Sequence, residues 1–172
     1  MTFNKMAVLA LTATTLMAFS PSAKALMVED TETFVKMATI SNMFEIESSK
    51  VALQKSKNPQ VKKFAQQMIT DHTNAAAKMK LSLMKAKYDM SAVPVKLDQK
   101  HADMLMDLEK DSAADFDEDY VEAQVKAHDE AVTLFTDYAE DGDNTILKTF
   151  AASTLPVLKM HQEHVDAMDR AK

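Results

Sequence analysis

The hydrophobic positions of this chain recur at steps of three and four residues along most of its length, the spacing of one face of an α-helix. They predict four long amphipathic helices and one short helix, at residues 31–57, 59–87, 116–140, 145–170 and 96–110. Short turns follow the first and third long helices, whereas a longer connection follows the second. This order predicts an all-α fold, a four-helix bundle whose single crossover contains the short helix.

Several residues mark where these helices begin and end. Asn58 is a good N-cap, and Pro59 stands at the first helical position, where its missing N–H has no cost. Asp115 can cap the third long helix, and the breaker residues around Gly142 predict the turn before the fourth. Pro156 lies inside the fourth long helix, where it predicts a kink or a break.

Each long helix carries an ionisable residue on its apolar face. These residues are Glu45, His72, His128 and His161. The core of a helical bundle is a usual place for a metal site, because side chains from facing helices converge there. Three neutral imidazoles and a carboxylate suit zinc, copper or iron. The pattern therefore predicts a transition-metal site with these four residues as ligands and Asp71 as supporting partner.

The number of residues between each of these side chains and the nearest turn predicts its position along the helix axis. Glu45 lies 13 residues before Asn58 and His72 lies 14 after it, so the two are expected at one level. His128 lies 14 residues before Gly142 and His161 lies 19 after it. At 1.5 Å per residue this second difference amounts to about 7 Å along the helix axis, which is large for two ligands of one ion.

Two simpler interpretations remain open for the same residues. A histidine on an apolar face is often a hydrogen-bonded core residue, and Glu45 with His72 can form a buried ion pair that sets helix register. Buried histidines also titrate near neutral pH and can act as proton sensors. The scattered methionines are interpreted as flexible core filler rather than as copper ligands.

The N-terminus has the pattern of a secretory signal peptide. Lys5 precedes an apolar run at residues 6–19, and Ala23-Lys24-Ala25 gives the small-x-small ending of a cleavage site. We expect a signal peptide at residues 1–25, cut after Ala25, and one domain at residues 26–172 that is exported to the periplasm.

The composition of the chain further limits which partners and binding sites are expected. The predicted mature chain has 18 basic and 26 acidic residues, a net charge of −8, which disfavours nucleic acid as a partner. No later stretch is apolar enough to cross a membrane, which leaves peripheral association with the envelope. The absence of cysteine excludes thiolate metal sites, and the single glycine excludes a P-loop or a dinucleotide-binding fingerprint.

Three groups of residues resemble the motifs of a known family. They are Phe34, Ala38, Glu45 and Ala52 with Asn58-Pro59, Val61-Lys62, Phe64-Ala65 and Asp71-His72; Phe116-Asp117 and Tyr120 with His128; and Leu155-Pro156 with His161. Over residues 31–168 the chain resembles a family of exported bacterial proteins that is defined by a domain of unknown function and often labelled as predicted outer-membrane proteins. The resemblance implies a ferritin-like four-helix bundle.

Ferritin-like di-iron proteins use Glu-x-x-His on two helices. Here Ile69, Val125 and Leu158 stand three residues before the core histidines. We therefore assign no oxidase or ferroxidase chemistry and no catalytic residue.

The sequence as a whole predicts an exported ferritin-like bundle that binds a transition metal and acts in envelope homeostasis or stress. Asp117 and Tyr120 are expected to lie near the metal ligands as supporting polar residues. The alternative is a non-catalytic structural or interaction module of the envelope without a metal, whose inward histidines only set register.

Overall fold

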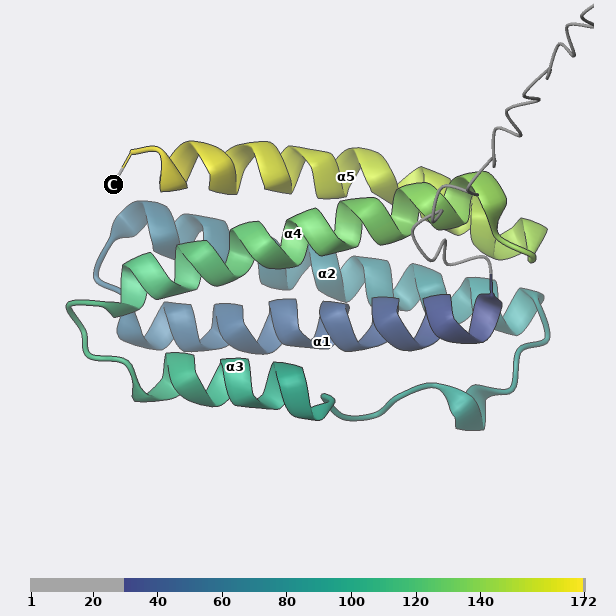
Figure 1. The fold of residues 1–172 in the computed structure, drawn as a ribbon, viewed down its shortest axis with the longest axis horizontal. Coiled ribbons are helices and arrows are strands. Elements are labelled where there is room, and N and C mark those ends of the chain that lie inside the picture. Colours follow the sequence, from purple (N-terminus) through teal and green to yellow (C-terminus); the bar gives the residue numbers. More distant parts are fainter. Residues whose placement is uncertain (1–29, 172) are drawn as a thin grey trace, which may run out of the picture.

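The computed structural model describes residues 30–171, and all regular structure in this part of the chain is helical (Figure 1). The elements are α1 (Thr31–Lys55), α2 (Pro59–Lys85), the 3₁₀ helix η1 (Met90–Ala92), α3 (Gln99–Lys110), α4 (Phe116–Asp141) and α5 (Thr145–Asp169). The prediction of an all-α fold is confirmed. None of these helices is both long and apolar enough to cross a membrane. The predicted signal peptide lies outside the described residues.

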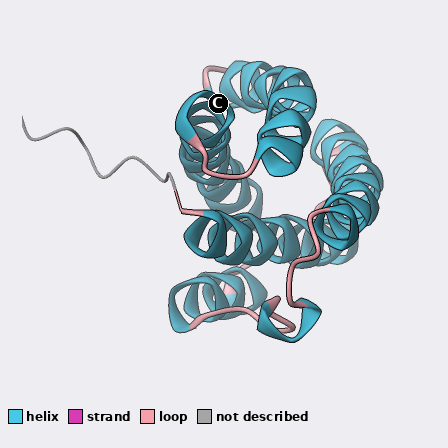
Figure 2. Cartoon of the chain, turned by 90° about the vertical axis from the view of Figure 1, so that its right-hand side faces the viewer, coloured by secondary structure: helices cyan, strands magenta, loops and turns pink. Residues whose placement is uncertain are grey.

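The four long helices contact one another in a ring. α1 packs against α2 and α4, and α5 also packs against α2 and α4. The short helix α3 lies outside this ring, alongside α1 (Figure 1), and contacts α1 and α4. Figure 2 views the chain end-on and shows the loops that join these helices. The sequence order α1, α2, α4, α5 thus places each long helix beside two others.

Two long helices begin with an asparagine cap, of which the sequence indicated only the first, Asn58. The Asn58 side chain accepts a hydrogen bond of 2.9 Å from the backbone N–H of Gln60, and Pro59 is the first residue of α2. The side chain of Asn144 accepts bonds from the backbone N–H groups of Ile146 and Leu147, at 3.0 and 3.2 Å. These bonds satisfy N–H groups that have no partner within the helix. Asp115 directly precedes α4, as predicted, but its side chain makes no capping bond; it accepts a hydrogen bond of 2.7 Å from Ser112 Oγ instead.

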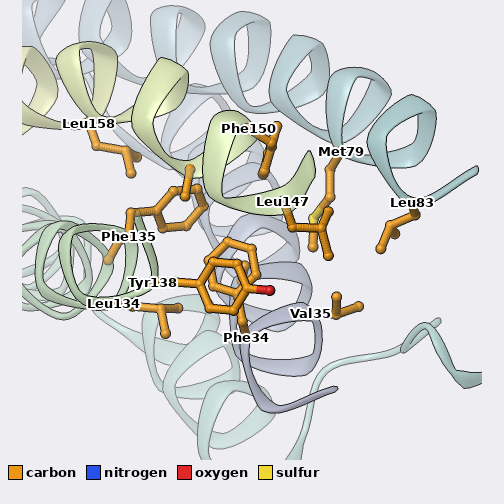
Figure 3. Close-up of a cluster of buried hydrophobic side chains, with 13 residues drawn as sticks. Phe34, Val35, Met79, Leu83, Leu134, Phe135, Tyr138, Leu147, Phe150 and Leu158 are labelled. Carbon is orange, nitrogen blue, oxygen red and sulfur yellow. The ribbon is translucent and has the colours of Figure 1, made fainter. Parts of the chain in front are cut away.

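Among residues 30–171, the buried apolar side chains form two clusters at different heights along the long helices. Figure 3 shows the first, in which the rings of Phe34 and Tyr138 stack with centroids 3.9 Å apart. The second cluster includes Phe44, Phe64 and Tyr120. Both clusters draw residues from α1, α2, α4 and α5, so each ties the four long helices together.

Pro156 does not break the last helix, contrary to one of the two outcomes that the sequence predicted. α5 continues from Thr145 to Asp169 across it. Proline removes the hydrogen bond to the carbonyl group four residues earlier, which here belongs to Ala152. Ala152 and Pro156 both lie on the exposed face of α5, so water can solvate that carbonyl group.

Lys87, just after α2, has the backbone conformation that usually belongs to glycine. Its φ angle is +56°, in the left-handed region. The N–H of Tyr88 bonds the carbonyl oxygen of Leu83 at 3.0 Å, and the N–H of Lys87 bonds that of Met84 at 3.2 Å. These two bonds form a Schellman motif, in which glycine is favoured because a Cβ atom is strained at this position.

We therefore expect Lys87→Gly to stabilise the protein. The removed strain exceeds the extra freedom that glycine gives the unfolded chain, so the free energy of unfolding should rise by roughly 0.5–1 kcal/mol. Urea denaturation monitored by circular dichroism measures this change.

The matched control is Lys85→Gly, the same replacement two residues earlier in the last turn of α2. Because Lys85 is helical, glycine there should lower the free energy of unfolding by about 0.5–1 kcal/mol. If the Lys87→Gly variant is destabilised as much as this control, strain at Lys87 is not the cause.

Candidate metal centre

A polar layer separates the two apolar clusters at the middle of the long helices. On α2 it falls between Met68 and Met79 and contains His72; on α4 it falls between Ala127 and Ala131 and contains His128. On α5 it contains His161. The three histidines are 5%, 0% and 1% exposed, respectively. Each side chain therefore projects into the space that the four long helices enclose.

The three imidazole rings form a nearly equilateral triangle. The ring centroids of His72 and His128 are 5.9 Å apart, and each is 5.5 Å from the centroid of His161. One ring nitrogen from each histidine lies within 4.8 Å of one from each of the others. Three of the four predicted ligands therefore converge on one small region of the core.

One nitrogen of each ring is held by an oxygen acceptor. His72 Nδ1 lies 3.2 Å from Asn42 Oδ1, and His128 Nδ1 lies 2.9 Å from the carbonyl oxygen of Gln124. His161 Nε2 lies 2.9 Å from Asp71 Oδ2. Since these oxygens accept hydrogen bonds, each of these nitrogens carries the proton in the neutral ring.

The second nitrogen of each ring has no hydrogen-bond partner among residues 30–171. These atoms are His72 Nε2, His128 Nε2 and His161 Nδ1. With the proton on the other nitrogen, each of these atoms is left with a free lone pair. An unpaired buried acceptor of this kind costs about 1–3 kcal/mol, so three in one layer need an explanation.

Burial favours the neutral form of two of these rings, those of His72 and His161. It lowers the pKa of His72 well below its ordinary value of 6.5, and the neighbouring His128 and His161 lower it further. Burial also lowers the pKa of His161, against the opposing effect of its hydrogen bond to Asp71. The unprotonated imidazole is the form that binds a metal.

Glu45, the fourth predicted ligand, lies beside this group rather than within it. Its Oε1 atom is 3.8 Å from His128 Nδ1, the nitrogen that faces the carbonyl oxygen of Gln124. Neither carboxylate oxygen has a hydrogen-bond partner in the described chain. Burial raises the pKa of Glu45, whereas the nearby His128 lowers it. The carboxyl group thus lies in the same polar layer, next to His128 rather than next to His72.

Of the three predicted supporting residues, only Asp71 lies in the polar layer. Asp71 bonds His161 on α5 rather than its sequence neighbour His72. Tyr120 lies two turns before His128, about 12 Å along α4, and its hydroxyl group bonds Ser49 Oγ at 2.9 Å. Asp117 lies in the first turn of α4, about 16 Å from the level of His128.

The offset between His128 and His161 is smaller than the count from Gly142 predicted, and their ring centroids are 5.5 Å apart. α4 ends at Asp141 and α5 begins at Thr145, so the turn is centred one residue after Gly142. Shifting the centre by one residue changes the difference in height by two residues, which leaves about 4.5 Å for the side chains to span.

Asn42 and Gln124 are parts of the site that the sequence reasoning missed. Asn42 stands one turn before Glu45 on α1, and Gln124 one turn before His128 on α4. The signal available for both was a polar residue three or four positions before an inward-facing ionisable residue.

We expect the metal-free protein to lose stability as the pH falls below about 6.5. His72 stays neutral in the folded state while the unfolded chain takes up a proton, so acid favours unfolding, by up to about 1.4 kcal/mol per pH unit for one such histidine. Urea titrations between pH 7.5 and 5 in the presence of chelator measure the slope.

The His72→Gln variant isolates this contribution. Glu45 acts in the opposite direction, because its raised pKa makes the folded state hold a proton that the unfolded chain releases. It is present in both proteins, so their difference cancels it. The variant should show a shallower fall below pH 6.5; parallel curves would contradict the prediction.

The family comparison agrees with the resemblance that the motifs indicated. A family model described as a domain of unknown function (DUF4142) matches residues 16–168. No curated protein and no solved structure matches the chain. The match spans most of the sequence and includes every residue of the polar layer. The chain belongs to the family defined by this domain, DUF4142.

Proposed function

We propose that the four long helices form a ferritin-like four-helix bundle whose polar layer binds one transition-metal ion through His72, His128 and His161. The observation that carries this proposal is that one ring nitrogen from each of these three buried histidines lies within 4.8 Å of one from each of the others. Each ring also has one nitrogen without a hydrogen-bond partner in the described chain. Two imidazoles in contact could satisfy each other if one donated and the other accepted. Here the donating nitrogen of each ring is already engaged by an oxygen.

The geometry of the layer suits a metal ion. Zinc binds histidine nitrogen at about 2.0–2.1 Å, which places the nitrogens of a tetrahedral site about 3.3 Å apart. The donor atoms here lie within 4.8 Å of one another, so small rotations of the side chains bring them onto one ion. A bound ion would satisfy all three unpartnered nitrogens at once.

Neutral imidazole ligands favour zinc, copper or iron over hard cations such as magnesium or calcium. Three protein ligands leave a further coordination position open, as in zinc sites that bind water or a substrate. We assign the site no reaction. The proposal concerns binding of a single ion, because the Glu-x-x-His pattern of bridging di-iron sites is absent from the sequence.

We propose supporting roles for the carboxylates and for Asn42. Asp71 and Asn42 would hold the rings of His161 and His72 in the orientation that points their free nitrogens at the ion. Glu45, 3.8 Å from His128, would provide negative charge close to the cation without coordinating it.

We further propose that the protein is exported and acts in metal homeostasis or the stress response of the cell envelope. The pattern at residues 1–25 supports export, and the acidic balance of the remaining chain favours a role away from nucleic acid. The other function considered, a structural module of the envelope, applies if the layer binds no ion.

Metal content tests the central proposal. Mature protein made without a histidine tag, exposed to zinc, copper or iron and then dialysed, should retain about one equivalent of one of these ions by mass spectrometry. His128→Gln and His161→Gln should lose it. Asp71→Asn should keep the stoichiometry but bind about 10–100-fold more weakly, because Asp71 only orients a ligand.

The matched control is His164→Gln, on α5 one turn after His161. His164 packs edge-on against Phe64 with ring centroids 5.1 Å apart and is not one of the three converging histidines. This variant should bind the ion as the wild type does. Absence of any ion from the wild type, or equal retention by all the variants, would overturn the metal site.

The N-terminal residue of the protein tests export. If the chain is cut as the sequence predicts, protein recovered from the periplasmic fraction of an expressing bacterium should begin at Leu26. Edman degradation or intact-mass measurement identifies this residue. Recovery of the uncleaved chain from the cytoplasm would contradict the proposal.

A further inference from the structure

An apolar cavity adjoins the polar layer on the side of the first apolar cluster. Its volume is about 210 Å³, and all four long helices contribute to its walls. Buried side chains of the first cluster form the inner part, among them Met79, Phe135, Phe150 and Leu158 (Figure 3). His72 also lines the cavity, so one wall is a member of the proposed metal site.

Small side chains account for the empty space. Alanine occupies four lining positions, Ala38 on α1, Ala75 and Ala76 on α2, and Ala131 on α4. Larger residues at these places would close the gap, as they do elsewhere in the core. Protein interiors are packed as densely as organic crystals and contain few voids larger than a water molecule. A pocket of this size that extends from the surface into the core is therefore unusual.

The cavity has a polar inner wall and an apolar body. The polar wall is His72 together with Asn42, which holds its Nδ1 atom. At the other side, between α1 and α2, the lining residues Ala76, Lys80 and Met90 are exposed and form the mouth. Met90 is a flexible side chain that can adapt to different shapes at this opening.

We propose that this cavity binds the apolar part of a small uncharged molecule whose single polar atom reaches the metal at the His72 end. An apolar protein cavity of about 150 Å³ stays dry and binds benzene, so about 210 Å³ accommodates roughly eight or nine non-hydrogen atoms. An aromatic ring with a short substituent has this size. Binding of the apolar part follows from the cavity alone, whereas contact with the ion rests on the proposed function.

Three probe molecules distinguish binding in the apolar cavity from contact with the metal ion. Benzene fills the cavity only, imidazole binds a metal only, and 4-phenylimidazole combines the two. Binding of each to the mature protein, metal-free and zinc-loaded, is measured by NMR titration. Benzene should bind both forms. 4-Phenylimidazole should bind the zinc-loaded form at least about tenfold more tightly than it binds the metal-free form, and more tightly than imidazole does, because its two parts occupy linked subsites.

Ala38→Leu and Ala75→Leu place a larger side chain in the cavity and should each abolish benzene binding. Ala152→Leu, on the exposed face of α5 and outside the lining, should leave it unchanged. The wild-type titrations decide the question even if one filled variant fails to fold.

No binding of benzene to wild-type protein would overturn the cavity as a ligand site. Binding of benzene without any preference of 4-phenylimidazole for the zinc-loaded form would overturn the contact with the metal. Benzene binding by a protein that retains neither zinc, copper nor iron would overturn the proposed function while supporting the cavity. The two proposals therefore fail in distinguishable ways.

Discussion

The packing of the four long helices holds three imidazole rings close together in the middle of the apolar core. Each ring has one nitrogen bonded to an oxygen and one without a partner in the described chain. Leaving these acceptors buried is unfavourable, and the two apolar clusters on either side must offset that cost. Because both clusters include residues from all four long helices, they resist the sliding of one helix that would separate the rings.

The connections at the helix ends hold this register. Two short turns, each ended by an asparagine cap, limit how far α1 can shift against α2 and α4 against α5. At the α4–α5 turn a Cβ atom on Gly142 would lie 2.6 Å from the carbonyl oxygen of Tyr138, so no larger residue fits without movement. The hydroxyl groups of Tyr138 and Thr31 bond at 2.6 Å, which ties this turn to the start of α1. The turns at the ends of the long helices thus help to hold the residues of the polar layer in register.

The sequence predicted the helices well and the contacts of the layer only in part. Helix positions follow from apolar spacing and capping residues, which are local properties, and they were correct to within three residues. The inward direction of the three histidines is equally local. Their relative height depends on where each turn is centred, and an error of one residue moves a pair by about 3 Å. The bond from Asp71 to His161 joins residues 90 positions apart, so no local pattern indicates it.

Charge balance explains why two carboxylates accompany three neutral ligands in the proposed site. Imidazoles supply lone pairs but no negative charge, and a divalent cation in an apolar core is strongly unfavourable without compensation. Glu45 lies 3.8 Å from His128, and Asp71 lies 2.9 Å from His161. If both are ionised, their two negative charges balance the charge of one divalent cation. In the metal-free protein, burial raises the pKa of Glu45 and favours its protonated form, which keeps excess negative charge out of the core. A nearby cation favours the ionised carboxylate, so an ion that enters the layer would lower the pKa of Glu45 and oppose the effect of burial.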